Sequence, residues 1–223
     1  MKPNVYKNIE LNLQPDYLTC FEGLSQDSEA YRFLIDMTQT IGPSLEPRGA
    51  LLICPVEILG ENQVSVGGTV MESRLVSKKL SHQKAVVVAL TTIGGVEKLS
   101  EGNYLDTLKG RFFYAILHQV RGKMKEMARQ LLQVNDVSEL NPGSLPDWPI
   151  CHNRNLFDLL GDTVEELGVT LRPDGFMTPV NTTCGIYFSD DSDYVNCRLC
   201  KKFDCIGRRE PFDAAGYTEM FGE

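Results

Sequence analysis

The sequence contains no apolar run close to the ~20 residues that a helix needs to cross a bilayer. Residues 1–16, MKPNVYKNIELNLQPD, also lack the apolar stretch of a secretion signal. Basic residues are fewer than acidic ones, 22 against 30, so the net charge is -8. A nucleic-acid-binding domain usually carries an excess of positive charge on one face. We therefore expect a cytoplasmic protein that binds neither membranes nor nucleic acid.

Histidine is scarce too, and its three occurrences, His82, His118 and His152, form no H-x-x-H or H-E-x-x-H pattern. Cysteine is more frequent, with seven residues in the chain. An odd number of cysteines without a secretion signal is typical of free thiols in a reducing compartment rather than of a disulfide framework. The cysteine thiols are therefore the first candidates for a functional site.

Three of these cysteines, Cys197, Cys200 and Cys205, lie within nine residues in the segment NCRLCKKFDC. A C-x2-C pair with a third thiolate nearby supplies one face of a tetrahedral site, and soft thiolates suit both zinc and iron–sulfur clusters. Our first choice for a fourth ligand is Cys184, and the second is Cys151 with His152. An open fourth position, a disulfide and buried free thiols are the alternatives.

Basic residues surround this cysteine segment and form the only basic cluster of the sequence (Arg198, Lys201, Lys202, Arg208, Arg209). Positive groups beside a cysteine lower the pKa of its thiol and complement an anionic cluster. A solvated surface run is the alternative interpretation of the same charges.

Hydrophobic periodicity predicts a mixture of strands and helices. Strands are expected at 9–13, 50–59, 64–66, 85–93, 169–171 and 184–189, and helices at 28–41, 71–80, 103–133 and 154–167. The helix at 103–133 carries an apolar stripe at three- and four-residue steps and would be about 45 Å long, so it should cross the whole domain. Asn103 and Asp106 would stabilise its N-terminus. The last segment, 211–223, is polar and is expected to be loosely held.

Two loops contain glycine or proline patterns that bear on ligand binding. Gly94-Gly95 follows the apolar strand at 85–93, but it lacks the further glycine of a nucleotide-binding fingerprint, so an ordinary methyltransferase of that fold is disfavoured. The loop at 141–149, NPGSLPDWP, contains three prolines and the only tryptophan. Its Pro142-Gly143 turn would expose backbone amides suited to a ligand, or it is a plain connector between elements.

Three stretches, in this order, resemble the activation domain of cobalamin-dependent methionine synthase. The first is Thr91-Thr-Ile-Gly94 followed by the long helix. The second is Asn141-Pro-Gly-Ser144 with Asp147-Trp-Pro149. The third and most specific is Met177-x-Pro179, five residues, then Gly185-Ile-Tyr-Phe-Ser189. The chain resembles even more closely the short free-standing bacterial proteins that look like that domain. The resemblance covers roughly 51–189, and the cysteine segment is similar only to the free-standing relatives.

This resemblance implies an α+β fold: a curved mixed or antiparallel sheet with a long central helix and flanking helices. It implies S-adenosylmethionine as ligand, contacted by Tyr187 and Ser189 from the strand and by Pro142, Gly143 and Ser144 from the loop. The family's loop begins with an arginine, whereas Glu139 and Leu140 stand there in this chain. A family acidic residue on the long helix is replaced by Tyr114 or His118.

The division expected along the chain is an N-terminal strand–helix lobe at 1–48, an activation-domain-like core at 49–190 and a cysteine-rich segment at 191–223. The function implied is the reactivation of a corrinoid protein or cobalamin-dependent methyltransferase by reductive methylation, with cobalamin held on the partner. No catalytic residue is assigned. An iron–sulfur centre held by the cysteines would supply single electrons, whereas zinc would not. The alternative is a non-catalytic binding module that zinc stabilises and that docks onto a corrinoid protein.

Overall fold

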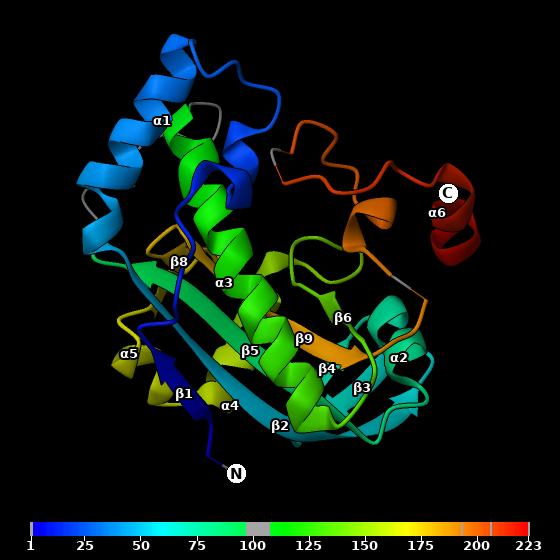
Figure 1. Ribbon diagram of the computed structural model, residues 1–223. Coiled ribbons are helices and arrows are strands. Elements are labelled where there is room, and N and C mark those ends of the chain that lie inside the picture. The colour runs from blue at the N-terminus through cyan, green and yellow to red at the C-terminus, as the bar shows by residue number, and fades with distance from the viewer. Residues whose placement is uncertain (1, 97–107, 193, 206, 223) are drawn as a thin grey trace.

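The computed structural model describes residues 2–96, 108–192, 194–205 and 207–222 (Figure 1). Its strands are β1 (Asn4–Lys7), β2 (Glu46–Gly60), β3 (Gln63–Val66), β4 (Thr69–Glu72), β5 (Ala85–Gly94), β6 (Val137–Leu140), β7 (Thr170–Leu171), β8 (Met177–Thr178) and β9 (Thr182–Ser189). Its helices are α1 (Glu29–Thr40), α2 (Arg74–Leu80), α3 (Leu108–Leu132), α4 (Asn153–Leu160), α5 (Thr163–Glu166) and α6 (Ala214–Phe221).

Seven strands form one sheet in the order β4-β3-β2-β5-β9-β6, with β1 paired to the first half of β2. All of the strand pairs are antiparallel. The long strand β2 pairs with β5 over 46–55 and continues past it to pair with β3. The α+β class with a largely antiparallel sheet is therefore confirmed.

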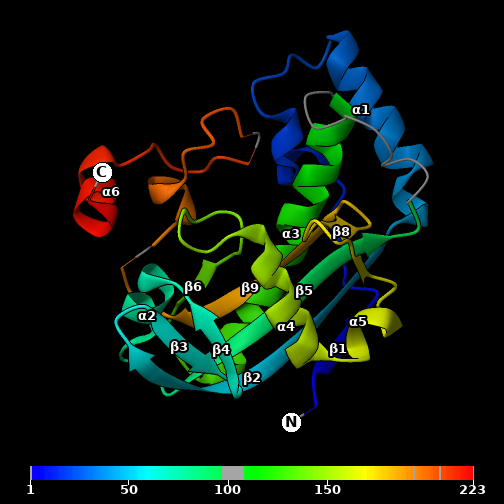
Figure 2. The same ribbon diagram turned by 180° about the vertical axis from the view of Figure 1, so that it is seen from behind.

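The two faces of the sheet are covered by different layers. Figure 1 shows α3 lying along one face of the sheet with α1 beside it. Figure 2 shows α4 and α5 on the opposite face. Alternation along β5 and β9 divides the core accordingly: Val87, Ala89 and Tyr187 face α3, whereas Val88, Ile186 and Phe188 face the layer that contains α4 and Trp148. A strand buried on both faces reads as a continuous apolar run, which explains the sequence of β5.

The elements with strong local signals form as predicted. Ser28 accepts a hydrogen bond from the Tyr31 amide, as an N-cap residue does, and α1 follows it. The long helix is confirmed over Leu108–Leu132, with its apolar stripe buried against β5 and β2. Asn103 and Asp106, which were predicted to stabilise the N-terminus of this helix, lie outside the described residues.

Four local predictions are wrong. The first strand is Asn4–Lys7 rather than 9–13, because β1 is selected by pairing with β2. Met71 belongs to β4, so α2 begins only at Arg74. The helix expected at 154–167 is broken at Gly161, whose φ of 55° and ψ of -140° are not helical. The C-terminal segment forms α6 instead of a loose tail, because Tyr217 and Met220 are buried.

The N-terminal part of the chain contributes to the same sheet and core as the rest. β1 pairs with β2, and buried residues of α1, such as Leu34, share one cluster with buried residues of α3, such as Phe112. Within the described ranges, none of the helices combines the length and the apolarity needed to cross a bilayer.

Candidate ligand and thiol site

The candidate site lies where β6 stops short of its neighbour β9. Pairing between the two strands runs from Val137–Ser189 to Leu140–Ile186, so β6 does not accompany the Thr182–Gly185 half of β9. The chain instead turns away at Asn141, whose side-chain amide donates to the Cys184 carbonyl at 3.0 Å. A methyl group at Gly185 would lie 2.5 Å from the Leu140 carbonyl oxygen, so only glycine allows this close crossing.

A cavity of about 230 Å³ opens at this edge. It is bounded by α3, by the loop after β6, by the half of β9 that β6 does not pair with and by the C-terminal segment. Its lining includes polar groups (Tyr114, Arg121, Asn141, Ser144, Asn153, Thr182, Thr183, Asn196, Lys202, Arg208, Arg209), four thiols (Cys184, Cys197, Cys200, Cys205) and Pro142, Ile150, Met177 and Gly207.

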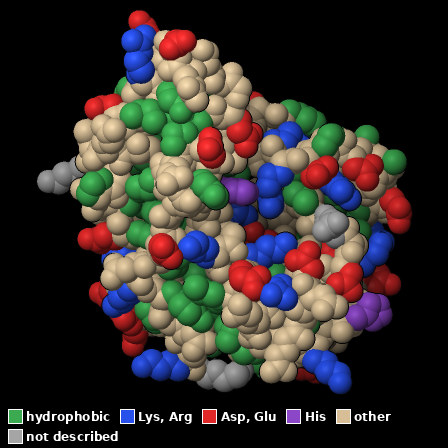
Figure 3. Space-filling model, viewed as in Figure 1, with side chains coloured by type: hydrophobic (Ala, Val, Ile, Leu, Met, Phe, Trp, Pro, Cys, Tyr) green, Lys and Arg blue, Asp and Glu red, His purple; other side chains and the backbone are tan. Residues whose placement is uncertain are grey.

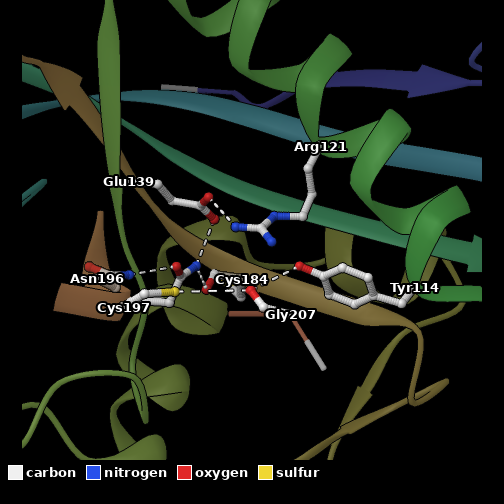
Figure 4. A network of polar contacts seen from close by, with 8 residues as sticks. Tyr114, Arg121, Glu139, Cys184, Asn196, Cys197 and Gly207 are labelled. Atoms are coloured by element: carbon white, nitrogen blue, oxygen red, sulfur yellow. Dashed lines mark hydrogen bonds and ion pairs between the residues drawn. The ribbon is translucent and has the colours of Figure 1, made fainter. Parts of the chain in front are cut away.

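A buried ion pair joins Arg121 of α3, which lines this cavity, to Glu139 of β6 (Figure 4). The side chains are 16% and 11% exposed. Burial alone would raise the pKa of Glu139, but the Arg121 guanidinium and the Asn141 amide outweigh it, so that pKa is lowered. Arg121 therefore holds Glu139 ionised. Its Nε is buried without a hydrogen-bond partner among the described residues.

Hydrogen bonds connect this pair to the C-terminal segment. The Asn141 amide donates to Glu139 at 2.7 Å, and its carbonyl accepts from Asn196 at 2.9 Å. On α3, the Tyr114 hydroxyl donates to the Gly207 carbonyl at 3.2 Å. Figure 4 shows Tyr114 and Arg121, about two turns apart on α3, with both side chains reaching toward the strands and the C-terminal segment.

A second cavity of about 450 Å³ adjoins the first and shares Tyr114, Gly207, Arg208 and Arg209 with it. Its own lining adds His118 and Arg111 of α3 and three residues of the N-terminal segment (Thr19, Cys20, Glu22). Burial and the charges of Arg121 and Arg209 lower the pKa of His118. Figure 3 shows Lys and Arg side chains flanking a hollow between α3 and the C-terminal segment.

One arginine organises the C-terminal segment over the cavity. The Arg208 guanidinium donates to four backbone carbonyls, those of Cys197, Cys200, Lys202 and Glu210, at 2.7–3.1 Å. Between β9 and α6, the regular structure of the described residues is limited to a 3-10 turn at Asn196–Leu199. Arg208 therefore supplies the contacts that a sheet or helix would otherwise provide.

Two of the three predicted loop residues line the first cavity, but Gly143 and the predicted strand residues do not. Pro142 and Ser144 line the first cavity, and the Gly143 amide donates to the Trp148 carbonyl within the loop. Tyr187 is 1% exposed in the core under α3, where its hydroxyl bonds to Arg121. Ser189 lines a separate cavity near α2. Tyr187 therefore contacts Arg121 from within the core instead of facing a ligand.

The structure brings Cys184, Cys197, Cys200 and Cys205 to the same cavity, whereas Cys151 does not line it and is exposed. Burial raises the pKa of the Cys184 thiol strongly. Across the described ranges, however, no three His, Cys, Asp or Glu side chains are grouped so that they could hold one metal ion. Among the described residues, the structure thus shows no site for a single metal ion at the predicted ligands, whether zinc or iron.

The sequence predictions missed Arg121, Asn141 as a hydrogen-bonding group, and Asn196. A signal for the first was present, because Tyr114, His118 and Arg121 recur at i, i+4 and i+7 and so share one face of α3. The other two are single asparagines in loops, and no local pattern marks them.

Comparison with known proteins gives one informative result. No family model matches the chain, and no curated protein matches it. Among solved structures, the chain is similar to the crystal structure of the MetH reactivation domain bound to AdoHcy, with a TM-score of 0.55 and 14% sequence identity. The match covers 87% of this chain and 81% of that one. At this identity the likeness establishes the fold.

Proposed function

We propose that this protein binds S-adenosylmethionine and takes part in the reactivation of a corrinoid protein. The observation that carries the proposal is the pair of adjoining cavities beside α3 and the 141–149 loop, in a fold similar to a reactivation domain that was solved with AdoHcy. AdoHcy is what remains of S-adenosylmethionine after its methyl group has left. The first cavity lies at the edge of the sheet and opens to solvent, so a partner's corrinoid could approach the site.

The reaction proposed is reductive methylation of the partner's cobalamin, which is the substrate. One electron from a low-potential flavoprotein or similar one-electron carrier reduces cob(II)alamin to cob(I)alamin. The cobalt then attacks the sulfonium methyl group, the S–CH3 bond breaks, and methylcob(III)alamin and S-adenosylhomocysteine result. The role of this chain is to bind and orient the methyl donor, since no described side chain needs to form a covalent bond.

Cationic groups of the site are suited to the ligand's carboxylate. The arginine that begins the family's loop is replaced here, but Arg121 and Arg209 line the cavity from α3 and from the C-terminal segment. The unpartnered Nε of Arg121 and the exposed Arg209 can both donate to an anion. We assign the carboxylate to Arg209, because Glu139 already neutralises Arg121.

The volumes of the two cavities indicate where the rest of the ligand would lie. Pockets for ligands of this size hold about 300–1,000 Å³, and the first cavity, at about 230 Å³, is smaller. The adjoining cavity of about 450 Å³ shares Tyr114 and Gly207 with it. This second cavity falls within that range, so we expect it to hold the ligand, with the carboxylate at Arg209, which lines both cavities.

Calorimetric titration with S-adenosylhomocysteine tests the binding directly. Arg209→Met should weaken binding about tenfold, because a charge-assisted hydrogen bond contributes roughly 1.5 kcal/mol or more and each 1.4 kcal/mol is a factor of ten. Arg172→Met is the matched control, since Arg172 is exposed beside the β7–β8 hairpin and does not line either cavity.

The functional assay follows methylcobalamin formation on a cob(II)alamin-loaded corrinoid protein with S-adenosylmethionine and a reductant. Dependence of that formation on this protein supports the proposal. No heat of binding in the wild type, together with no methylcobalamin, would refute it. A protein that still bound the corrinoid partner under those conditions would be the non-catalytic docking module.

A further inference from the structure

We propose that Cys184, Cys197, Cys200 and Cys205 hold an iron–sulfur cluster in the cavity at the edge of β9. The inference goes beyond the proposed function, and it does not depend on S-adenosylmethionine binding. Neither the fold nor the comparisons assign a metal centre to this chain.

The four thiols come from two separate parts of the chain. Cys184 is fixed in the middle of β9, between β5 and the crossing at Asn141. The other three follow in the segment that Arg208 organises over the cavity. The three remaining cysteines, Cys20, Cys54 and Cys151, do not line this cavity. Convergence of four of the seven thiols on one small cavity is the pattern of a thiolate-ligated centre.

A polynuclear group holds its thiolates farther apart than a single metal ion does. Zinc lies about 2.3 Å from each sulfur in a tetrahedral site, which brings all four sulfurs within roughly 4 Å of one another. Within the part of the chain that the structure describes, no three of these side chains are gathered in that way. They surround a cavity of about 230 Å³ instead. An iron–sulfur cluster is bulky and takes four thiolates at its corners, so it fills such a space.

The charges at the cavity suit an anionic centre. Thiolates bring negative charge, and Arg121, Lys202, Arg208 and Arg209 line the same cavity. The backbone amide of Arg209 donates to Cys197 Sγ at 3.4 Å. Hydrogen bonds to the sulfurs and nearby positive charge are the means by which proteins stabilise and tune such clusters.

The local backbone presents the C-x2-C pair in a suitable way. Residues three apart in a 3-10 turn lie on the same side, and Cys197 and Cys200 are related in this way by the turn at Asn196–Leu199. Cys205 belongs to a second turn, in which the Arg208 amide donates to the Cys205 carbonyl at 3.0 Å. Arg208 ties the two turns together, because it bonds to the carbonyls of Cys197, Cys200 and Lys202.

The test is the metal content of the full chain, purified anaerobically without added ligand and then reconstituted with ferrous iron and sulfide. We expect roughly two or four iron atoms and as many acid-labile sulfides per chain, broad visible absorption, and an electron paramagnetic resonance signal after reduction or oxidation. Because no S-adenosylmethionine is present, failure here is distinguishable from failure of the proposed function.

Matched cysteine variants decide which thiols are ligands. Cys197→Ser, Cys200→Ser and Cys205→Ser should each lose most of the iron and sulfide, whereas Cys151→Ser, which changes an exposed thiol outside the cavity, should keep them. Cys184→Ala should lose them as well, and Cys54→Ala, another buried strand cysteine, should not. Circular dichroism of each variant verifies folding, and if Cys184→Ala misfolds, the three serine variants decide.

Two results would overturn the proposal. One is a protein that contains one zinc ion and no sulfide both after anaerobic purification and after reconstitution. The other is iron and sulfide that stay at the wild-type level in the folded variants of the four cavity cysteines.

Discussion

Replacing Glu139 by glutamine should destabilise the protein strongly, because Arg121 would remain buried without its counter-ion. The two side chains are only 16% and 11% exposed, so water cannot replace the lost carboxylate. Breaking a buried pair by removing one partner costs about 3–5 kcal/mol. Since a domain has a total stability of about 5–15 kcal/mol, the variant should unfold at a much lower urea concentration.

The loss should depend on pH in a defined direction. The pKa of Glu139 is lowered from its ordinary value of 4.5 in the folded protein. The pair therefore contributes its full stability above pH 4.5 and loses it as the pH falls from 4.5 through the folded pKa. The difference in unfolding free energy between the wild type and Glu139→Gln should accordingly be large at pH 7 and shrink below pH 4.5.

Urea unfolding followed by circular dichroism measures both effects. The double variant Arg121→Met/Glu139→Gln should recover part of the loss, since it leaves no buried charge. Arg129→Met is the control, because it breaks the solvent-exposed pair with Glu126 on the same helix and should leave the midpoint near that of the wild type. A loss below about 1 kcal/mol for Glu139→Gln at pH 7, as for an exposed pair, would refute the reasoning.

Three further changes test other parts of the structure. Gly185→Ala should lower the free energy of unfolding by about 1–3 kcal/mol through overpacking, because the new methyl group would lie 2.5 Å from the Leu140 carbonyl oxygen. Thermal melting measures this loss, and an unchanged melting temperature would contradict the close crossing of Gly185 and Leu140. Burial and nearby guanidinium groups lower the pKa of His118 from 6.5, so stability should fall as the pH drops below 6.5, and His118→Gln should remove that part of the slope between pH 7 and pH 5. Asp213→Ala removes the acceptor of the Gly216 amide at the start of α6, which should cost about 0.5–2 kcal/mol and speed hydrogen exchange in α6 alone; equal exchange in both proteins would argue against the cap.

Elements with strong local signals could be predicted from the sequence. The N-cap Ser28 marks the start of α1, the run of buried residues marks β5, and the apolar stripe marks α3. In each case the signal lies within the element itself, as a cap or a periodicity. Such signals remain valid wherever the element packs.

Elements that depend on distant partners could not be predicted. β6 is only four residues long and exists because it pairs with β9, almost 50 residues later. β1 is likewise selected by β2. α6 has a weak pattern of its own, and burial of Tyr217 and Met220 stabilises it. Short elements of this kind take their structure from tertiary contacts, which no local window contains.

The candidate site shows the same division. The spacing of Cys197, Cys200 and Cys205 is visible in the sequence, and the choice of Cys184 as a fourth member agrees with its place in the cavity. The ion pair of Arg121 with Glu139 joins two elements that the sequence does not connect. The resemblance placed Tyr187 toward a ligand, but the alternation of side chains along β9 turns it toward α3.

The guanidinium of Arg208 makes the C-terminal segment sensitive to a single substitution. Four carbonyl oxygens from residues up to thirteen positions apart meet at one planar fork. Lysine would keep the positive charge, but its one ammonium group has three donors and no plane, so it could not reach all four oxygens. A chain with lysine at this position would retain its sheet and helices. The part of the C-terminal segment that covers the thiols would lose its attachment as a whole.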